Sequence, residues 1–80
     1  MSDTADEVRP EPATAYYGTG AVQSTGFHLD GQMHGEWAFY RTDGSVMRTG
    51  AFDRGIQVGV WRTYDRSGRL VKETRMKEPG

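Results

Sequence analysis

The chain has 80 residues, no cysteine and a formal net charge of −1, which allows one small domain and excludes disulfides, thiol catalysis and cysteine-ligated metal. Leu, Ile, Val and Phe together number only 12, yet nine aromatic residues at so small a net charge argue against a disordered chain. Tryptophan and tyrosine must therefore supply much of the buried surface. So thin a core favours a marginal monomer, or one that completes its burial against a second molecule.

Residues 1–12 are acidic and hydrophilic, with a balance of −3, and predict a disordered acidic tail. They have neither the basic start nor the apolar stretch of a secretory signal, and no run in the chain reaches the 18 or so apolar residues of a membrane span. We therefore expect a cytoplasmic protein. Residues 54–77 are basic, with a balance of +5, so the acidic tail could fold back on this end, although a solvated tail beside a solvated strand is the simpler interpretation.

Residues 13–77 predict an all-β domain, because short alternating runs are separated by glycines and no amphipathic stretch of ten residues is free of them. Asp43-Gly44 predicts a two-residue type I′ hairpin turn. Further turns are expected at Thr19-Gly20, Asp30-Gly31, Arg54-Gly55 and Ser67-Gly68. The result is a single-layer antiparallel meander of about six strands, near residues 13–17, 21–29, 33–41, 45–53, 57–65 and 69–77, with a short tail at 78–80.

The two-residue turn at Asp43-Gly44 sets an expected register. It places Tyr40 opposite Met47 and Trp37 opposite Gly50. The indole would then cover the bare glycine backbone, an arrangement known as aromatic rescue. Side-chain alternation puts Trp37 on one face and Tyr40 on the other, so both faces carry aromatic residues.

The same counting in the next hairpin places Arg62 opposite Glu73, a favourable cross-strand charge pair. The last strand alternates charged and apolar residues, which discourages pairing at that edge of the sheet. The first edge, residues 13–17, is short and less protected. We expect any strand-to-strand association there.

A 24-residue repeat underlies this pattern. Gly-x-Trp-x-x-Tyr-x-x-x-Gly occurs twice, and Gly26 recurs as Gly50 in the same frame. The motif residues are Gly35, Trp37, Tyr40 and Gly44, then Gly59, Trp61, Tyr64 and Gly68. The array comprises a partial repeat at 13–25 and full repeats at 26–49 and 50–73. A unit of this size cannot bury its apolar face alone, so neighbouring units must stack.

The segments GEWAFYRTDG and GVWRTYDRSG, in their 24-residue frame, resemble the MORN repeat family and look closest to its bacterial variant. The resemblance covers about residues 16–73. It implies an elongated sheet of β-hairpins acting as a non-catalytic interaction module that binds protein partners, forms homodimers or holds anionic phospholipids. Some bacterial variants are antitoxin components of toxin–antitoxin pairs, which is a further function that the resemblance implies. Eukaryotic arrays are longer and order their glycines differently, and the family's repeats supply no catalytic residue.

Two histidines, His28 and His34, flank the first hairpin with Asp30 between them, and these residue types can bind zinc. The next repeat has Phe52 and Val58 in place of the histidines, so the repeat itself needs no metal. We interpret His28 and His34 as exposed turn residues and expect no metal and no cofactor.

Catalytic chemistry finds no support in the sequence. Ser45 and Ser67 lie in or beside turns with no histidine near in the expected register, and no glycine-rich loop precedes a helix as the common phosphate-binding motifs require. We therefore expect a protein that is not an enzyme and has no small-molecule substrate.

An exposed mixture of aromatic and basic residues is the surface that we expect to contact a partner, because interface hot spots favour these residue types. The alternative is that the aromatic residues only pack the repeat, as their recurrence in phase suggests. The expected partner-binding residues are Trp37, Tyr40, Trp61, Arg62, Tyr64 and Arg66.

The sequence thus predicts a non-enzymatic protein–protein interaction module that binds a different protein or itself. The alternative is a binder of an anionic ligand, a phospholipid head group or a nucleic acid, through the basic C-terminal end. Of these, a protein partner is favoured over an anionic membrane, and a membrane over nucleic acid.

Overall fold

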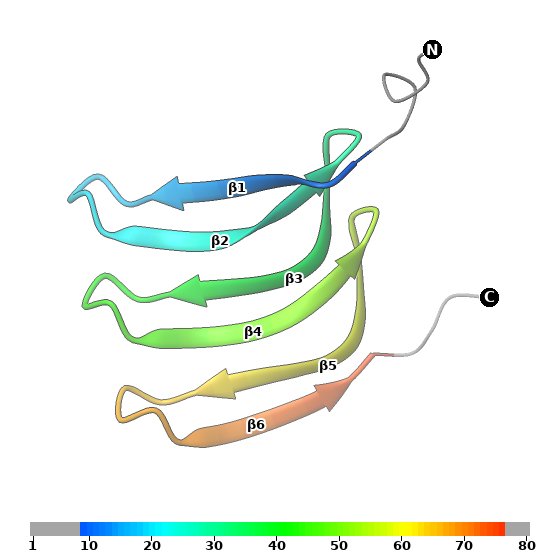
Figure 1. Ribbon diagram of the computed structural model, residues 1–80. Coiled ribbons are helices and arrows are strands. Elements are labelled where there is room, and N and C mark those ends of the chain that lie inside the picture. Colours follow the sequence, from blue (N-terminus) through cyan, green and yellow to red (C-terminus); the bar gives the residue numbers. More distant parts are fainter. Residues whose placement is uncertain (1–8, 77–80) are drawn as a thin grey trace, which may run out of the picture.

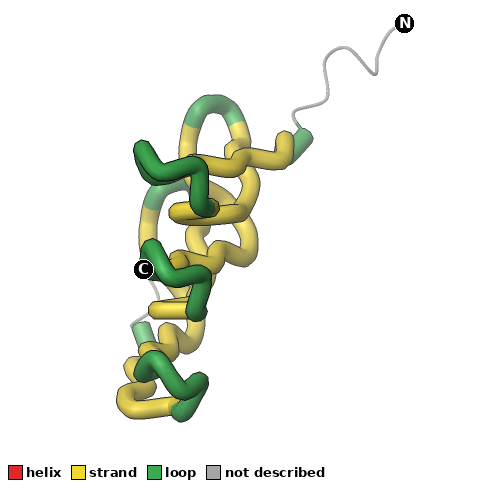
Figure 2. Tube along the Cα trace, turned by 90° about the vertical axis from the view of Figure 1, so that its left-hand side faces the viewer, coloured by secondary structure: helices red, strands yellow, loops and turns green. Residues whose placement is uncertain are grey.

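The computed structural model describes residues 9–76, which form one open six-stranded antiparallel sheet (Figure 1). The strands are β1 (Glu11–Tyr16), β2 (Val22–Leu29), β3 (Gln32–Tyr40), β4 (Val46–Asp53), β5 (Ile56–Tyr64) and β6 (Leu70–Arg75), and they lie side by side in chain order. The molecule measures 14 Å along its shortest axis, and no second layer covers the sheet in the described part of the chain (Figure 2). The predicted single-layer meander is confirmed.

All six expected strands are present, with bounds that differ from the prediction by at most two residues within the described range. Because β1 begins at Glu11, the predicted boundary of the acidic tail at residue 12 is two residues too late. Residues 1–8 of that tail and the predicted tail at 78–80 fall outside the described residues. Residues 9–76 contain no helix, hence none of the length and apolarity that crossing a bilayer requires.

Two kinds of turn alternate along the sheet. The tight turns are Asp30-Gly31 and Arg54-Gly55, where both residues have positive φ (54° and 79°, then 49° and 89°). Positive φ at both central residues defines the type I′ turn, whose twist matches that of the two strands it joins. These two turns lie together at one end of the sheet (Figure 1).

The turn at Asp43-Gly44 is wider than predicted, and its assignment as type I′ is wrong. Gly44 has a φ of 91°, but Asp43 is not in the left-handed region. Gly44 N–H donates to Arg41 O at 2.9 Å and Arg41 N–H donates to Ser45 O at 2.9 Å, which encloses three residues. This is a type I turn followed by a left-handed glycine, the usual three-residue hairpin loop. Equivalent turns close β1–β2 and β5–β6.

The wider turn changes the register next to it. A bulge between Phe39 and Tyr40 places Tyr40 opposite Val46, so the predicted Tyr40–Met47 pair is wrong. The bulge absorbs the extra turn residue. Beyond it the predicted register is restored, and the pairing of Trp37 with Gly50 is confirmed. In the next hairpin the pairing of Arg62 with Glu73 is likewise confirmed.

Strands β3 and β5 bend sharply near their middle (Figure 1). Within these strands Gly35 and Gly59 have φ of 80° and 74°, which side-chain-bearing residues rarely adopt. Pairing between β2 and β3 is interrupted at the same level, between Thr25 and Phe27. The few buried apolar side chains of the described chain lie along the sheet: Leu29, Trp37 and Trp61, at 8%, 6% and 4% exposure.

Candidate partner-binding surface

Each tryptophan covers a glycine of the preceding strand. The Trp37 indole lies so close over Gly26 that a Cβ there would overlap the ring, and its Nε1–H donates to Phe27 O at 3.1 Å. Trp61 covers Gly50 in the same way and donates to Ala51 O at 3.2 Å. The two tryptophans therefore have equivalent surroundings, as the repeat requires.

This arrangement corrects the expected aromatic rescue. Trp37 is the backbone partner of Gly50 across β3–β4, but its ring covers Gly26 on β2 instead. The ring leans that way because β2–β3 pairing is interrupted beside Gly26, which leaves room over the glycine backbone. The indoles thus join one hairpin to the next, at β2–β3 and at β4–β5. We call each such unit an indole–glycine junction.

Phenylalanines connect the two junctions into one cluster. Phe39 stacks on Trp37 and on Trp61, with ring centroids 6.0 and 6.1 Å apart. Phe52 meets the same two indoles edge-on, at 6.2 and 5.1 Å. Offset and edge-to-face contacts at these distances each stabilise a pair by about 0.5–1.5 kcal/mol beyond area burial. We call this side of the sheet the aromatic face.

Arg48 covers the aromatic face from outside. Its guanidinium carbon lies 5.5 Å from the Phe39 centroid and 5.2 Å from that of Trp61. Both distances are within the range of a cation–π contact. The sequence analysis missed Arg48, although its position directly opposite Phe39 follows from the register that was predicted.

The opposite side of the sheet carries a groove of about 690 Å³ that extends from β1 to β5. The register aligns small side chains across its floor: Thr14 pairs with Thr25, Thr25 with Ala38, and Ala38 with Thr49. Arg62, opposite Thr49, closes the row. We call it the threonine groove. Small side chains at the bend of the sheet leave this concave surface open, and the sequence analysis did not identify it.

The structure does not gather the six predicted site residues into one site. Trp37 and Trp61 are buried in the junctions, which supports the alternative that these aromatic residues pack the repeat. Tyr40 and Tyr64 are half-buried beside the wide turns. Of the six, Trp37 and Arg62 line the threonine groove.

Two long side chains tie neighbouring hairpins together at the wide-turn end. Tyr17 Oη–H donates to Tyr40 O at 2.6 Å, and Arg41 Nη2–H donates to Tyr64 O at 2.6 Å. Tyr17 and Arg41 occupy the same repeat position, and so does Asp65. An ionised carboxylate cannot donate. Instead, Asp65 accepts hydrogen bonds from its own turn, at Ser67 N–H, Ser67 Oγ–H and Arg69 N–H, at 2.9, 2.6 and 3.0 Å.

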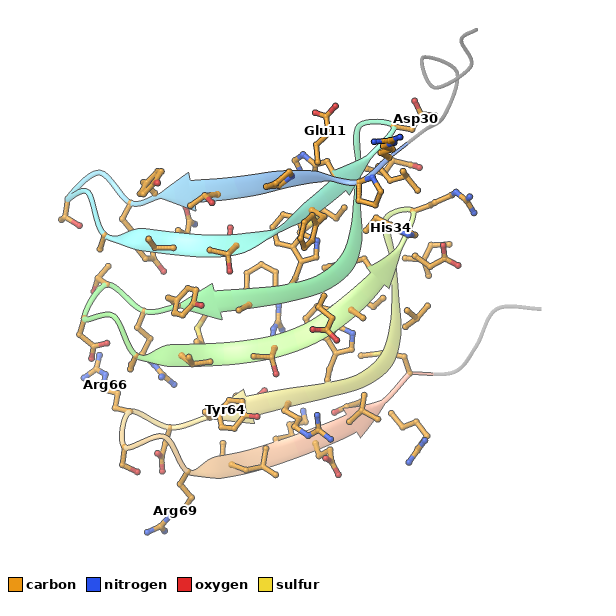
Figure 3. The ribbon with its side chains drawn as sticks, in the orientation of Figure 1. Glu11, Asp30, His34, Tyr64, Arg66 and Arg69 are labelled. Carbon is orange, nitrogen blue, oxygen red and sulfur yellow. The ribbon has the colours of Figure 1, made fainter. Side chains whose placement is uncertain are left out.

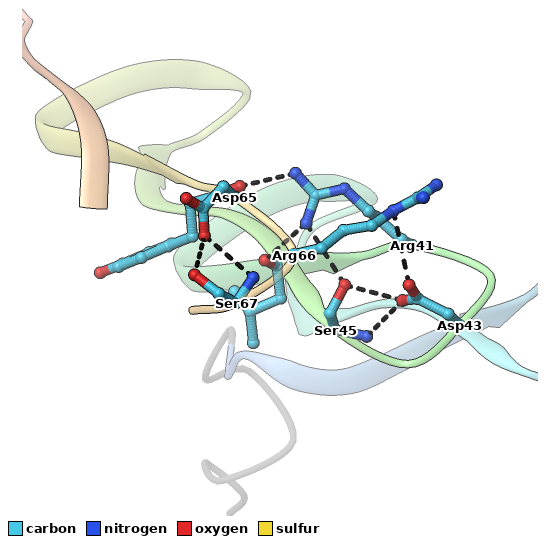
Figure 4. A network of polar contacts seen from close by, with 8 residues as sticks. Arg41, Asp43, Ser45, Asp65, Arg66 and Ser67 are labelled. Carbon is cyan, nitrogen blue, oxygen red and sulfur yellow. Dashed lines mark hydrogen bonds and ion pairs between the residues drawn. The ribbon is translucent and has the colours of Figure 1, made fainter. Parts of the chain in front are cut away.

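The wide turns carry a polar network (Figure 4). Ser45 donates to Asp43 from its hydroxyl and its backbone N–H, at 2.7 and 2.8 Å. These hydrogen bonds lower the pKa of Asp43, with the hydroxyl as the largest cause. The Ser67 hydroxyl is likewise the largest cause of the lowered pKa of Asp65. Both serines therefore stabilise turns.

Positive charge gathers around the last hairpin. Arg69, Lys72 and Arg75 are exposed on or beside β6, which confirms the predicted charged edge. Arg66 is 78% exposed and lies 3.5 Å from Asp43 of the neighbouring turn. Figure 3 shows Arg66 and Arg69 projecting from the wide-turn end.

The histidines have other contacts. His34 Nδ1 accepts from Arg54 N–H at 3.2 Å and lies 3.8 Å from Asp53, at the tight-turn end of the sheet (Figure 3). The His28 ring lies 5.5 Å from that of Trp37, centroid to centroid. Residues 9–76 hold no cluster of three or more His, Cys, Asp and Glu side chains with the geometry for a metal ion.

No protein-family model matches the chain, and no curated protein or solved structure is significantly similar to it. The assignment to a family therefore stays a prediction from the repeated motif.

Proposed function

We propose that this chain is a non-enzymatic interaction module that binds a protein partner. The single observation that carries the proposal is the threonine groove, a concave surface of about 690 Å³ across most of the sheet with no second layer over it among the described residues. Its volume is in the range of ligand-binding clefts, and we propose that side chains or a short segment of a protein partner occupy it. Arg62 and Glu36 supply charge at its walls, and Phe27 supplies apolar surface.

The contacts of the polar side chains support a role without catalysis. Both turn serines donate their hydroxyl protons to carboxylates rather than to a histidine base. A serine nucleophile is activated by donating to a general base such as histidine, which a third group orients, and the hydroxyl bonds of Ser45 and Ser67 go to turn carboxylates instead. We propose further that the fold is of MORN type, on the strength of the 24-residue repeat and the two equivalent indole–glycine junctions. We also propose that the protein acts in the cytoplasm, in keeping with its hydrophilic composition.

A matched pair of variants tests the groove. Thr49→Tyr places an aromatic ring on the groove floor, and Thr63→Tyr places the same ring on the aromatic face, on the adjacent strand opposite Arg48. Both threonines are half-buried. Partner capture from the source cells, followed by titration of the captured protein, should show binding by the native chain and by Thr63→Tyr. Thr49→Tyr should lose at least tenfold in affinity. Equal binding by both variants, or no captured protein, would overturn the proposal.

One observation favours a second candidate, an anionic ligand at the last hairpin. Arg66, Arg69, Lys72 and Arg75 are exposed there, and the acidic residues beside them are Glu73 and Asp65 of the same hairpin and Asp43, which lies 3.5 Å from Arg66. Binding to nucleic acid by such a cluster falls steeply with salt, because bound counterions are released. Filter retention of a single-stranded oligonucleotide and flotation with anionic vesicles, at low and high salt, separate the two ligands. Absence of retention and of flotation at low salt ends this candidate.

A further inference from the structure

The two ends of the sheet lack the junction that joins the hairpins inside it. At the repeat position that holds Trp37 in β3 and Trp61 in β5, β1 has Ala13. At the repeat position that holds Gly26 in β2 and Gly50 in β4, β6 has Thr74. A second copy therefore cannot extend the sheet head to tail through another indole–glycine junction, because β1 brings no indole and Thr74 offers no bare backbone.

The two edge strands also differ in charge. β6 and its turn expose Arg69, Lys72 and Arg75, which would repel another copy of the same edge. In β1, by contrast, residues 12–16 carry no charge, and Tyr16 is 61% exposed. Of the two edges, only β1 is suited to contact its own copy.

The backbone of β1 has free donors at known positions. Tyr17 N–H donates to Ala21 O at 2.8 Å, so Tyr17 belongs to a hydrogen-bonded pair with β2. Such pairs alternate along an antiparallel ladder. The equivalent hairpin, β5–β6, shows the same alternation of hydrogen-bonded pairs, because Met76 N–H donates to Gly59 O at 2.7 Å. The N–H and C=O groups of Thr14 and Tyr16 therefore point away from β2, as does the C=O of Pro12.

We propose that two copies of the chain pair through β1, antiparallel and related by a two-fold axis at Thr14. This inference deepens the self-association branch of the proposed function and names the surface. Thr14 of each copy exchanges N–H···O bonds with Thr14 of the other. Tyr16 N–H of each copy then donates to the second copy's Pro12 O. Proline has no N–H to leave unpaired at that position.

The side chains fit this pairing. Thr14 lies opposite the second copy's Thr14, a cross-strand pair that is favourable in sheets. Tyr16 lies opposite the second copy's Pro12, so that the pairing covers its exposed ring. Pro12 and Thr14 line the threonine groove, which becomes continuous across both copies. Glu11 is kept far from its own copy, because antiparallel pairing sends the two Glu11 residues to opposite ends of the joined strands.

Sedimentation equilibrium of the full chain over a range of concentrations tests the pairing. The native chain should approach twice its mass of 8.9 kDa. Thr14→Pro removes an outward N–H that β2 does not use, so the variant should fold and sediment as a monomer. Arg75→Pro removes an outward N–H from the opposite edge and should dimerise like the native chain. A native monomer at all concentrations, or equal loss in both variants, would overturn the proposal.

Charge exchange at the two-fold axis tests the register without a proline. Thr14→Lys and Thr14→Glu each place like charges opposite one another, so each variant alone should be monomeric. Their mixture should form a heterodimer, because lysine then faces glutamate. A mixture that stays monomeric contradicts the register. Thr14 is itself at the rim of the groove, so partner binding is followed with Thr49→Tyr, which leaves β1 unchanged. A native chain that is monomeric but whose partner binding is weakened by Thr49→Tyr would contradict this inference alone. A native dimer whose partner binding is unchanged by Thr49→Tyr would contradict the proposed function alone.

Discussion

The inner junctions of the sheet and its two outer edges belong to the same repeat, and they differ at the pair of positions that forms the junction. Inside, Trp37 covers Gly26 and Trp61 covers Gly50. At the edges, Ala13 and Thr74 take the equivalent positions. The comparison teaches that two residues per repeat decide whether one hairpin continues into the next. At its two ends the sheet has β1, which lacks the indole, and β6, which lacks the bare glycine.

A second difference supports the first. Tyr17 and Arg41 each donate a hydrogen bond to the following hairpin, whereas Asp65 at the same repeat position accepts bonds from its own turn. The last hairpin has no following hairpin within the described chain. Its Asp65 carboxylate accepts hydrogen bonds from its own turn instead. The substitutions below are ordered by the size of their expected effects on this contrast.

The largest effect is expected from removing a junction indole. Trp61→Ala should lower the free energy of unfolding by about 3–5 kcal/mol, because it removes a buried ring and leaves a cavity. Val71→Ala, at the exposed edge strand, should change it by no more than about 0.5 kcal/mol. Chemical denaturation of both variants gives the two values. Similar losses at the two positions would contradict the contrast between junction and edge.

Adding one methyl group at a junction glycine comes next. Gly50→Ala should cost about 1–3 kcal/mol, because the new Cβ overlaps the Trp61 ring and the packed indole cannot move away freely. Gly18→Ala is the control, since a Cβ there meets no atom within 4 Å. Thermal unfolding should separate the two by several degrees. An unchanged melting temperature in Gly50→Ala would mean that the Trp61 ring moves aside at no cost in stability.

The side chains that connect hairpins at the wide turns should contribute less. Arg41→Met removes hydrogen bonds to Tyr64 O and Val46 O, and should cost about 1.5 kcal/mol. Tyr17→Phe removes one hydroxyl bond and should cost about 1 kcal/mol. Urea titrations measure both, and a more stable Arg41→Met variant would show that these bonds do not hold the hairpins together.

The smallest effect concerns pH. The pKa of Asp65 is lowered from its ordinary value of 3.8 by the Ser67 hydroxyl and the Arg69 N–H. A carboxyl whose pKa is lower in the folded state stabilises the fold above the unfolded pKa, and this contribution is lost as the pH falls through the folded value. Stability should therefore be flat from neutral pH to about 5 and fall below about 4. Asp65→Asn should flatten part of that fall, measured by denaturation at a series of pH values.

The 24-residue repeat was sufficient to predict the sheet, because glycines mark the turns and alternation marks the strands. It was not sufficient for the turn type at Asp43-Gly44. Asp-Gly suits a type I′ turn, but the hydrogen bonds from Ser45 to Asp43 form in the wider loop. The tight turns at Asp30-Gly31 and Arg54-Gly55 were located but not recognised as the type I′ pair.

The candidate site was harder to predict than the fold. The sequence identified the tryptophans but could not show which glycine each covers, since that depends on the break in pairing beside Gly26. The threonine groove was missed for a related reason. Thr25 and Thr49 recur in phase, but the hollow along them depends on the curvature of the whole sheet (Figure 1), which no local pattern reveals.

The most direct test of the account is a double-mutant cycle at one junction. In the native background, Gly50→Ala should destabilise the fold because its Cβ overlaps Trp61. In a Trp61→Ala background the overlap is gone, and the same change should cost almost nothing, so the coupling should approach the whole single-variant effect. Gly26→Ala, whose neighbour is Trp37, should keep its full cost in that background. If Gly50→Ala costs the same with and without Trp61, the indole–glycine junction does not hold the hairpins together.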